Sequence, residues 1–168
     1  KLQRENESLK EQLKTIATQA PTGTETLSQG DEIVDIKYYF DADERRSYQR
    51  FRCENEEFYS WNELFACVAP HMIDECTDEV FEAGLGRYIE EHNNWEKMPE
   101  HCKFKNVRNF AISQESFGVI KVQFRALGLI SSGEKKRSAN DKQTYWKLTP
   151  YGDYVMTQLL AIKRPKEH

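Results

Sequence analysis

The pattern that most constrains the fold spans residues 113–155, where a helix, a basic loop and a second helix follow in close succession. Four apolar residues recur there at helical spacing, namely Phe117, Ile120, Phe124 and Leu127. Gly128 then ends the helix as a C′ glycine. Two short β-type runs flank a basic loop at residues 131–143, and Thr149 caps a last helix whose first position is Pro150. Its inner face is expected to hold Val155, Leu159 and Ile162. We therefore expect a β-hairpin between two helices.

Two more helices precede that pattern. Ser60 and Glu63 form a capping box in front of an apolar stripe made by Trp61, Leu64, Phe65 and Val68. Thr77 caps the second helix, whose apolar face holds Phe81, Leu85, Tyr88 and Ile89. An irregular surface loop is expected over residues 93–104. Residues 60–168 are thus predicted to form three helices, a two-stranded wing and a C-terminal helix, which is the element order of a winged helix.

A β-hairpin is predicted at residues 32–59. Its first strand alternates apolar and polar residues, and the apolar set is Val34, Ile36, Tyr38 and Phe40. Residues 41–46 form a polar turn, and the chain then returns as a second strand. Residues 21–31 are rich in Pro, Gly, Thr and Ser and nearly free of apolar residues, which is typical of a linker. The fold class is therefore predicted to be α+β.

The first helix, residues 1–20, follows a heptad pattern. With Leu2 at position d, the a and d positions of a parallel coiled-coil dimer are filled by Leu2, Asn6, Leu9, Leu13 and Ile16. Asn at a single a position specifies register and two-stranded pairing, and Glu5 and Lys10 would meet across the interface at g and e. The alternative is a short amphipathic helix packed on its own domain. Because the chain opens within this pattern and without Met, we expect it to be part of a longer protein.

Charge divides the chain into two halves. Residues 1–100 hold 11 Lys and Arg against 23 Asp and Glu, whereas residues 101–168 hold 13 against 5. A basic half points to nucleic acid or to an acidic partner, and the alternative is that the two halves attract each other. The candidate residues for duplex DNA lie on the third helix and in the wing: Gln114, Lys121, Arg125, Lys135, Lys136 and Arg137.

Catalytic, metal and membrane signals are weak or missing in the sequence. Cys67, His71 and Cys76 could be drawn with His101 and Cys102 as a zinc site, but the spacings do not match those of zinc knuckles. We expect free thiols in a reducing cytoplasm, with no metal and no cofactor. No convergent catalytic motif is found, so the chain is not expected to be an enzyme. No apolar run approaches the roughly 18 residues of a membrane span.

Four sequence blocks carry a family resemblance: LSQGDEIVDIKY, WNELFACVAPHMIDE, VIKVQFRALGLI and YWKLTPYGDYVMTQLLAIKR. They are similar to the C-terminal tail of a bacterial family whose members carry an N-terminal domain of unknown function, similar to Toll/interleukin-receptor-like domains, and then a coiled coil. The resemblance covers most of the chain. It implies an upstream effector domain of the same protein as a partner, and brings no catalytic residue onto these positions.

Two functions are therefore expected from the sequence. The first is a non-catalytic oligomerisation and regulatory or sensing interaction module, forming the C-terminal part of a larger bacterial protein. The second is a dimeric winged-helix domain that binds duplex DNA through its third helix and its wing.

Overall fold

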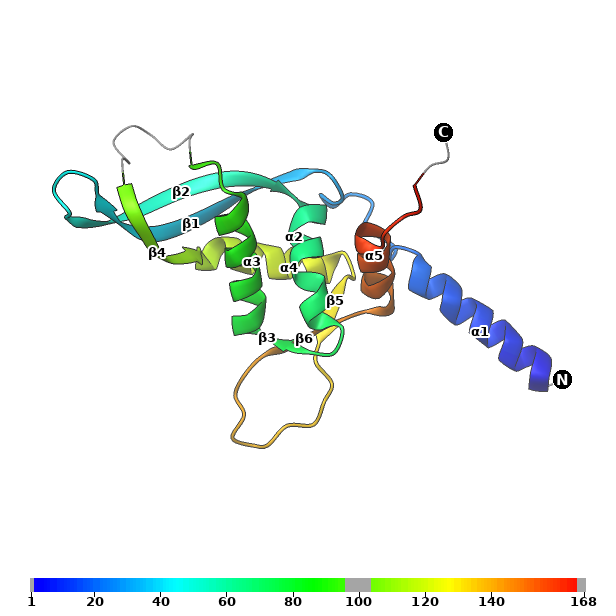
Figure 1. Ribbon diagram of the computed structural model, residues 1–168. Coiled ribbons are helices and arrows are strands. Elements are labelled where there is room, and N and C mark those ends of the chain that lie inside the picture. Colours follow the sequence, from blue (N-terminus) through cyan, green and yellow to red (C-terminus); the bar gives the residue numbers. More distant parts are fainter. Residues whose placement is uncertain (1, 96–103, 166–168) are drawn as a thin grey trace.

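The computed structural model describes residues 2–95 and 104–165 and has an α+β fold (Figure 1). Its α-helices are α1 (Leu2–Thr18), α2 (Trp61–Val68), α3 (Asp78–His92), α4 (Gln114–Ala126) and α5 (Pro150–Leu160), and a short 3₁₀ helix, η1 (Ala69–Met72), follows α2. The strands are β1 (Ile33–Glu44), β2 (Arg50–Ser60), β3 (Cys76–Thr77), β4 (Phe104–Ile112), β5 (Ile130–Ser132) and β6 (Tyr145–Leu148). They form two antiparallel sheets, ordered β2-β1-β4 and β3-β6-β5.

Helices α2, α3, α4 and α5 start where the sequence predicts them, because a side chain satisfies free N–H groups at the start of each. Ser60 accepts a hydrogen bond from the backbone N–H of Glu63, whose carboxylate accepts one from the Ser60 N–H, and this confirms the capping box. The predicted N-caps Thr77 and Thr149 are confirmed at α3 and α5. Ser113 also caps α4.

Two glycines are required by their backbone surroundings. Gly128 has a φ of +69°, and its N–H donates to the carbonyl of Arg125 while the N–H of Leu129 donates to that of Phe124. This is a Schellman motif, so the predicted helix end is confirmed. Gly152 lies against the backbone of Leu129, the residue before β5. An added Cβ at position 152 would stand 1.9 Å from the carbonyl oxygen of Leu129.

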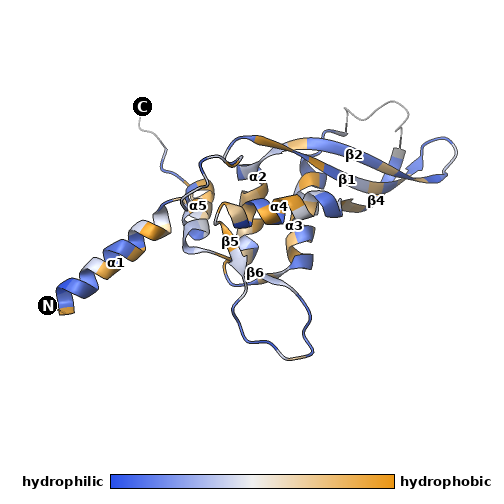
Figure 2. Cartoon of the chain, turned by 180° about the vertical axis from the view of Figure 1, so that it is seen from behind, coloured by the Kyte–Doolittle hydropathy of each residue, from blue (hydrophilic) through white to orange (hydrophobic). Residues whose placement is uncertain are grey.

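The core lies between the long sheet and helices α2, α3 and α4, whose apolar faces point inward (Figure 2). The predicted apolar faces of these helices are confirmed, since their residues are buried or, for Tyr88, partly buried. An aromatic cluster joins the three helices, with Phe124 packing against Phe65 at 5.3 Å and Phe81 against Phe117 at 5.2 Å between ring centroids. Burial of such rings is the main stabilising contribution of this body.

Strand β4 does not follow from the sequence pattern. Asn106 and Asn109 adopt positive φ values of 55° and 53°, and the pairing with β1 shifts register around them. These bulges break the two-residue alternation that marks a strand. The Asn109 amide donates to Asp41 at 2.8 Å, and the Asn106 amide donates to Asp43 at 3.1 Å. Hydrogen bonds from Asn106 and then Arg108 hold the pKa of Asp43 below its usual range.

The same contacts explain why β1 is longer than predicted. Residues 41–46 were expected to turn, but β1 continues to Glu44 and the turn follows at residues 45–49. Asp41 and Asp43 stay in the strand because β4 supplies donors for both carboxylates. Local composition favours a turn, and the cross-strand partners override it.

Residues 21–31 are docked on the body by hydrogen bonds. The indole N–H of Trp61 donates to Ser28 at 2.8 Å, and the Gln123 amide donates to the Ser28 carbonyl at 2.5 Å. Thr24 is buried. Although the composition is that of a linker, the chain between α1 and β1 is held against α2 and α4.

Three expectations about single segments differ from the structure or fall outside it. Ile162 was expected on the inner face of the last helix, but α5 ends at Leu160 and Ile162 is fully exposed, while Met156 is buried instead. The predicted surface loop begins in the core, because Asn93 is buried and Trp95 packs on Phe40 at 5.4 Å. The remainder of that loop, at residues 96–103, lies outside the described residues.

Candidate interaction surfaces

Helix α1 presents an unpartnered apolar stripe. It projects from the body, and only its C-terminal end lies beside α5 (Figure 1). No residue of α1 is buried, and the predicted interface residue Asn6 is exposed. The four apolar members of the predicted interface have exposed fractions of 77% for Leu2, 56% for Leu9, 66% for Leu13 and 69% for Ile16. Figure 2 shows these apolar positions recurring along the polar helix. The helix therefore touches its own domain at its C-terminal end beside α5, while its apolar stripe stays uncovered by the described residues.

The candidate DNA-contacting residues of α4 have partners within the chain. The Gln114 amide donates to Glu82 at 2.6 Å. Lys121 forms an ion pair with Asp78 at 3.0 Å, and its Nζ also lies 4.4 Å from the centre of the Phe117 ring. Both acids belong to α3. Two of the three predicted α4 contacts thus bind the neighbouring helix.

Arg125 differs, since it is exposed and its guanidinium lies over the ring of Trp146 at 5.7 Å. Two valines share the outer surface of α4 with it, Val119 at 48% and Val122 at 66% exposure. Apolar side chains at these positions suit contact with protein more than with phosphate.

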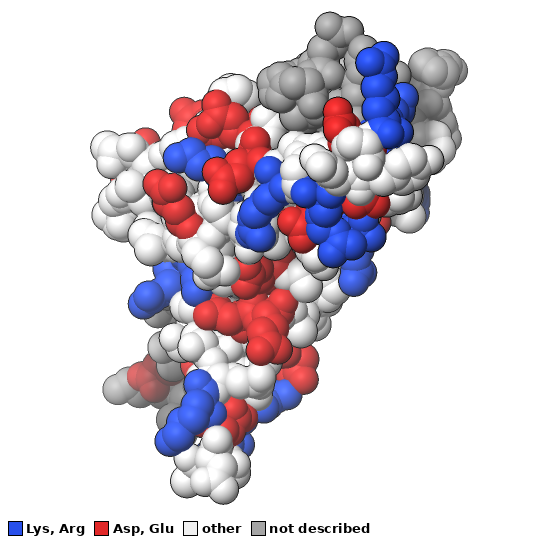
Figure 3. Space-filling view, turned by 90° about the vertical axis from the view of Figure 1, so that its left-hand side faces the viewer, with Lys and Arg blue, Asp and Glu red and all other residues white. Residues whose placement is uncertain are grey.

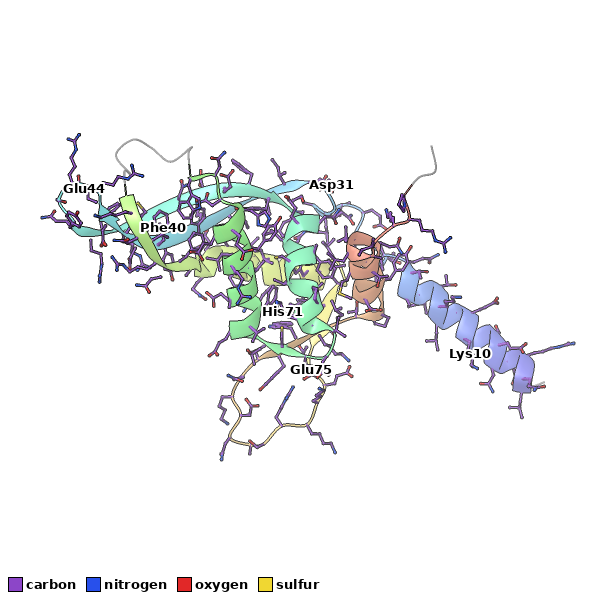
Figure 4. The ribbon with its side chains drawn as sticks, in the orientation of Figure 1. Lys10, Asp31, Phe40, Glu44, His71 and Glu75 are labelled. Atoms are coloured by element: carbon purple, nitrogen blue, oxygen red, sulfur yellow. The ribbon has the colours of Figure 1, made fainter. Side chains whose placement is uncertain are left out.

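The basic loop between β5 and β6 is held at its base by Glu75 (Figure 4). The Glu75 carboxylate accepts hydrogen bonds from the backbone N–H groups of Glu134 at 2.8 Å and Lys135 at 3.0 Å, and from the guanidinium of Arg137. The Lys135 ammonium forms an ion pair with Asp74 at 2.5 Å. We call this set of contacts the wing latch. It leaves Lys136 as the predicted wing cation with no partner among the described residues.

Two features make the wing latch specific. The Glu75 side chain is only 5% exposed, and Gly133 provides the space it needs, since a Cβ there would lie 2.8 Å from a Glu75 oxygen. Burial raises the pKa of Glu75, but hydrogen bonds from the backbone of Lys135 and Glu134 and from Arg137 outweigh it, and the net pKa lies below the usual range. The carboxylate is therefore ionised when it binds the wing.

Acidic residues thus neutralise most of the predicted basic surface. Figure 3 shows acidic and basic side chains side by side on the face seen from the hairpin end, with red side chains between and beside the gathered blue ones. A nucleic-acid surface normally concentrates unpaired Lys and Arg on one face. The other expectation was that the acidic and basic halves of the chain attract each other. The ion pairs of Asp74, Glu75 and Asp78 with cations of the second half agree with it.

The acidic partners were not identified in the sequence. Asp74, Glu75 and Asp78 are close together in the chain. Asp74 and Glu75 lie about 60 residues before the wing cations they meet, and Asp78 lies 43 residues before Lys121 of α4. Their signal in the sequence is a compact acidic segment that follows the first helix of the body. Opposite charge alone does not show which basic segment lies beside this acidic segment. The packing of α3 and α4 determines where the wing lies, and so which cations the acids meet.

Two of the described cysteines have raised thiol pKa values, and the described residues form no metal-binding group. Burial raises the pKa of the Cys67 thiol to about 12 and that of Cys76 to about 11, so both are protonated near neutral pH and are poor nucleophiles. Residues 2–95 and 104–165 hold no group of three or more His, Cys, Asp or Glu placed to bind a metal ion. His101 and Cys102, the other members of the zinc set drawn from the sequence, lie outside the described residues.

Comparison with protein-family models, curated proteins and solved structures finds no match for this chain. Within the described part of the chain, no helix combines the length and apolar character needed to cross a membrane.

Proposed function

We propose that this chain is a non-catalytic self-association and interaction module of the cytoplasm, in which α1 pairs in parallel with α1 of a second copy and the body contacts a protein partner. The observation that carries the proposal is the α1 stripe. Leu2, Leu9, Leu13 and Ile16 are all more than half exposed, and burying such a heptad seam against an identical helix removes its apolar area from water.

We also infer that residues 60–168 form a winged-helix type of body. The order α2, β3, α3, α4, β5, β6 and the sheet order β3-β6-β5 support it. The insertion of β4 between α3 and α4 departs from that type. It ties the body to the β1–β2 hairpin, so the hairpin and the body share one core.

The alternative, a dimeric domain that binds duplex DNA, has less support from the geometry. Lys121, Lys135 and Arg137 are each paired with an acid of the same chain. To contact phosphate, each would exchange an intramolecular partner for an intermolecular one, which reduces the net gain in binding free energy.

If an effector domain precedes α1, as the family resemblance implies, pairing through α1 would bring two effector domains together.

The test is the double substitution Leu9→Lys and Leu13→Lys. Two charges at adjacent a and d positions are incompatible with a dry helix pair. We expect the native chain to be a dimer and the variant a monomer when their masses are measured by light scattering at micromolar concentration.

A matched control places the same charges on the opposite side of α1. Ser8→Lys with Thr15→Lys changes two c positions and adds the same charge, and it should leave the dimer intact. A native chain that is already a monomer, or a Leu9→Lys/Leu13→Lys variant that keeps the native mass, would contradict pairing through α1.

A further inference from the structure

Strand β2 is a long, regular sheet edge. It pairs with β1 from Arg50 to Ser60 without a register shift, and in the sheet order β2-β1-β4 it has β1 as its one strand neighbour among the described residues. The opposite edge, β4, is interrupted at Asn106 and Asn109. An eleven-residue edge with no proline and no bulge offers a row of backbone donors and acceptors to another strand.

The outward side chains of β2 carry charges in a particular order. Alternate residues point away from the core, and along the strand they read Arg50, Arg52, Glu54 and Glu56, all exposed. Arg50 is only 3.9 Å from Asp43, and Arg52 lies over the Tyr39 ring at 3.8 Å. The carboxylates of Glu54 and Glu56 have no ion pair or hydrogen bond within residues 2–95 and 104–165.

Charges on an edge strand ordinarily discourage edge-to-edge pairing. Here the two halves of the strand have opposite signs, so an antiparallel copy of the same strand is complementary to it. We propose that β2 is a second self-association surface, which pairs antiparallel with β2 of another copy about a two-fold axis at Cys53 and joins the two sheets into one.

In that register each charged residue faces its opposite. Arg50 lies across from Glu56 and Arg52 across from Glu54, and the two-fold axis repeats both pairs. Directly opposed residues of antiparallel strands are close enough for such pairs to stabilise the sheet. The pairing gives Glu54 and Glu56 the partners that the described part of a single chain does not.

Other registers are disfavoured by the same charges. Because side chains alternate between the two faces, a register that keeps the outer face on one side can shift only in steps of two residues. A shift one way sets Arg52 against Arg52, and a shift the other way sets Glu54 against Glu54. Parallel pairing in register sets like charges against each other along the whole edge. The proposal therefore specifies one arrangement.

This contact is independent of α1, so the experiment is made in the full chain carrying Leu9→Lys and Leu13→Lys. Sedimentation velocity is recorded from micromolar to millimolar concentration. We expect a concentration-dependent change from monomer to dimer that stops at the dimer, because a two-fold contact of one surface closes on itself. Failure of α1 pairing would be seen separately, as a monomeric native chain at micromolar concentration.

Variants with reversed charges on β2 test whether this strand is the self-association surface. Glu54→Arg with Glu56→Arg makes the outer row wholly basic, and Arg50→Glu with Arg52→Glu makes it wholly acidic. Each variant alone should self-associate at least about 30-fold more weakly than the chain with the native edge, since four opposite-charge pairs become like-charge pairs. An equimolar mixture of the two should associate at least as well as the native edge.

The mixture also serves as the folding control, because only a folded strand of each variant can restore the contact. Three results would overturn the proposal: no association of the Leu9→Lys/Leu13→Lys chain at any concentration, unchanged association of either charge-reversed variant, or a mixture that stays monomeric. Any of them would leave the β2 edge to a strand of a different protein or to solvent.

Discussion

Helices α1 and α4 carry similar apolar stripes and have opposite surroundings. Leu9, Leu13 and Ile16 of α1 are exposed, whereas Phe117, Ile120 and Phe124 of α4 are almost completely buried. Helical periodicity therefore identifies the face that needs a partner. It does not say whether the partner is the rest of the chain, as for α4, or another molecule, as we propose for α1.

The largest expected effect comes from substituting an isoleucine in each of the two helices by alanine and comparing the loss of stability. Ile120 is fully buried and Ile16 is 69% exposed. Ile120→Ala should lower the free energy of unfolding by about 2–5 kcal/mol, because it leaves a cavity in the core. Ile16→Ala should change the stability of the monomer by less than about 0.5 kcal/mol and weaken self-association instead.

Chemical denaturation measures the first quantity and light scattering the second. The Leu9→Lys/Leu13→Lys background keeps the stability measurement free of self-association, since dimerisation itself stabilises the folded state. Equal destabilisation by both alanine substitutions in that background would mean that α1 packs on the body in solution.

A smaller, local effect is expected at the wing latch. The pKa of Glu75 is lower in the folded chain than in the unfolded chain, so its contribution to stability is present above the unfolded-state pKa. That contribution is lost as the pH falls through the folded-state value. Hydrogen exchange at residues 133–137 should therefore increase, relative to the body, in acid.

Glu75→Gln removes the titrating group while keeping its shape. In this variant the same amides should exchange faster near neutral pH, and their protection should no longer depend on pH in the acidic range. Protection at the wing that follows pH equally in the native chain and in the variant would assign the effect to another carboxylate.

The smallest effect is expected from the predicted DNA-contacting pair. Lys121 is held by Asp78 and Arg125 lies on Trp146, so Lys121→Glu with Arg125→Glu should leave the fluorescence anisotropy of labelled random duplex DNA unchanged, with no salt-dependent binding before or after the substitution. Binding by the native chain that falls steeply with salt and disappears in the variant would instead favour the DNA-binding alternative.

Local chemistry made much of the fold predictable. Ser60, Thr77 and Thr149 cap helices as predicted because a cap needs only a side chain and the next few N–H groups. Gly128 ends α4 for a similarly local reason. These features were read from a few consecutive residues.

Long-range partners were not predictable in the same way. Strand β4 was missed because Asn106 and Asn109 interrupt its alternation, and their positive φ values are stabilised by Asp41 and Asp43, more than 60 residues earlier. The two-residue strand β3 is too short to show a pattern and exists through its pairing with β6. The acids of the wing latch were missed because opposite charge has no fixed sequence spacing.

The sequence by itself determined where the helices begin and end and which of their faces are apolar, since both depend on neighbours within a turn or two of the chain. Only the tertiary structure decided which apolar face stays uncovered and which cations are neutralised. It placed Glu75 under the wing, left the apolar stripe of α1 exposed, and left the outer edge of β2 without a strand partner in the described chain. Burial and ion pairing depend on distances between remote segments, and folding alone sets those distances.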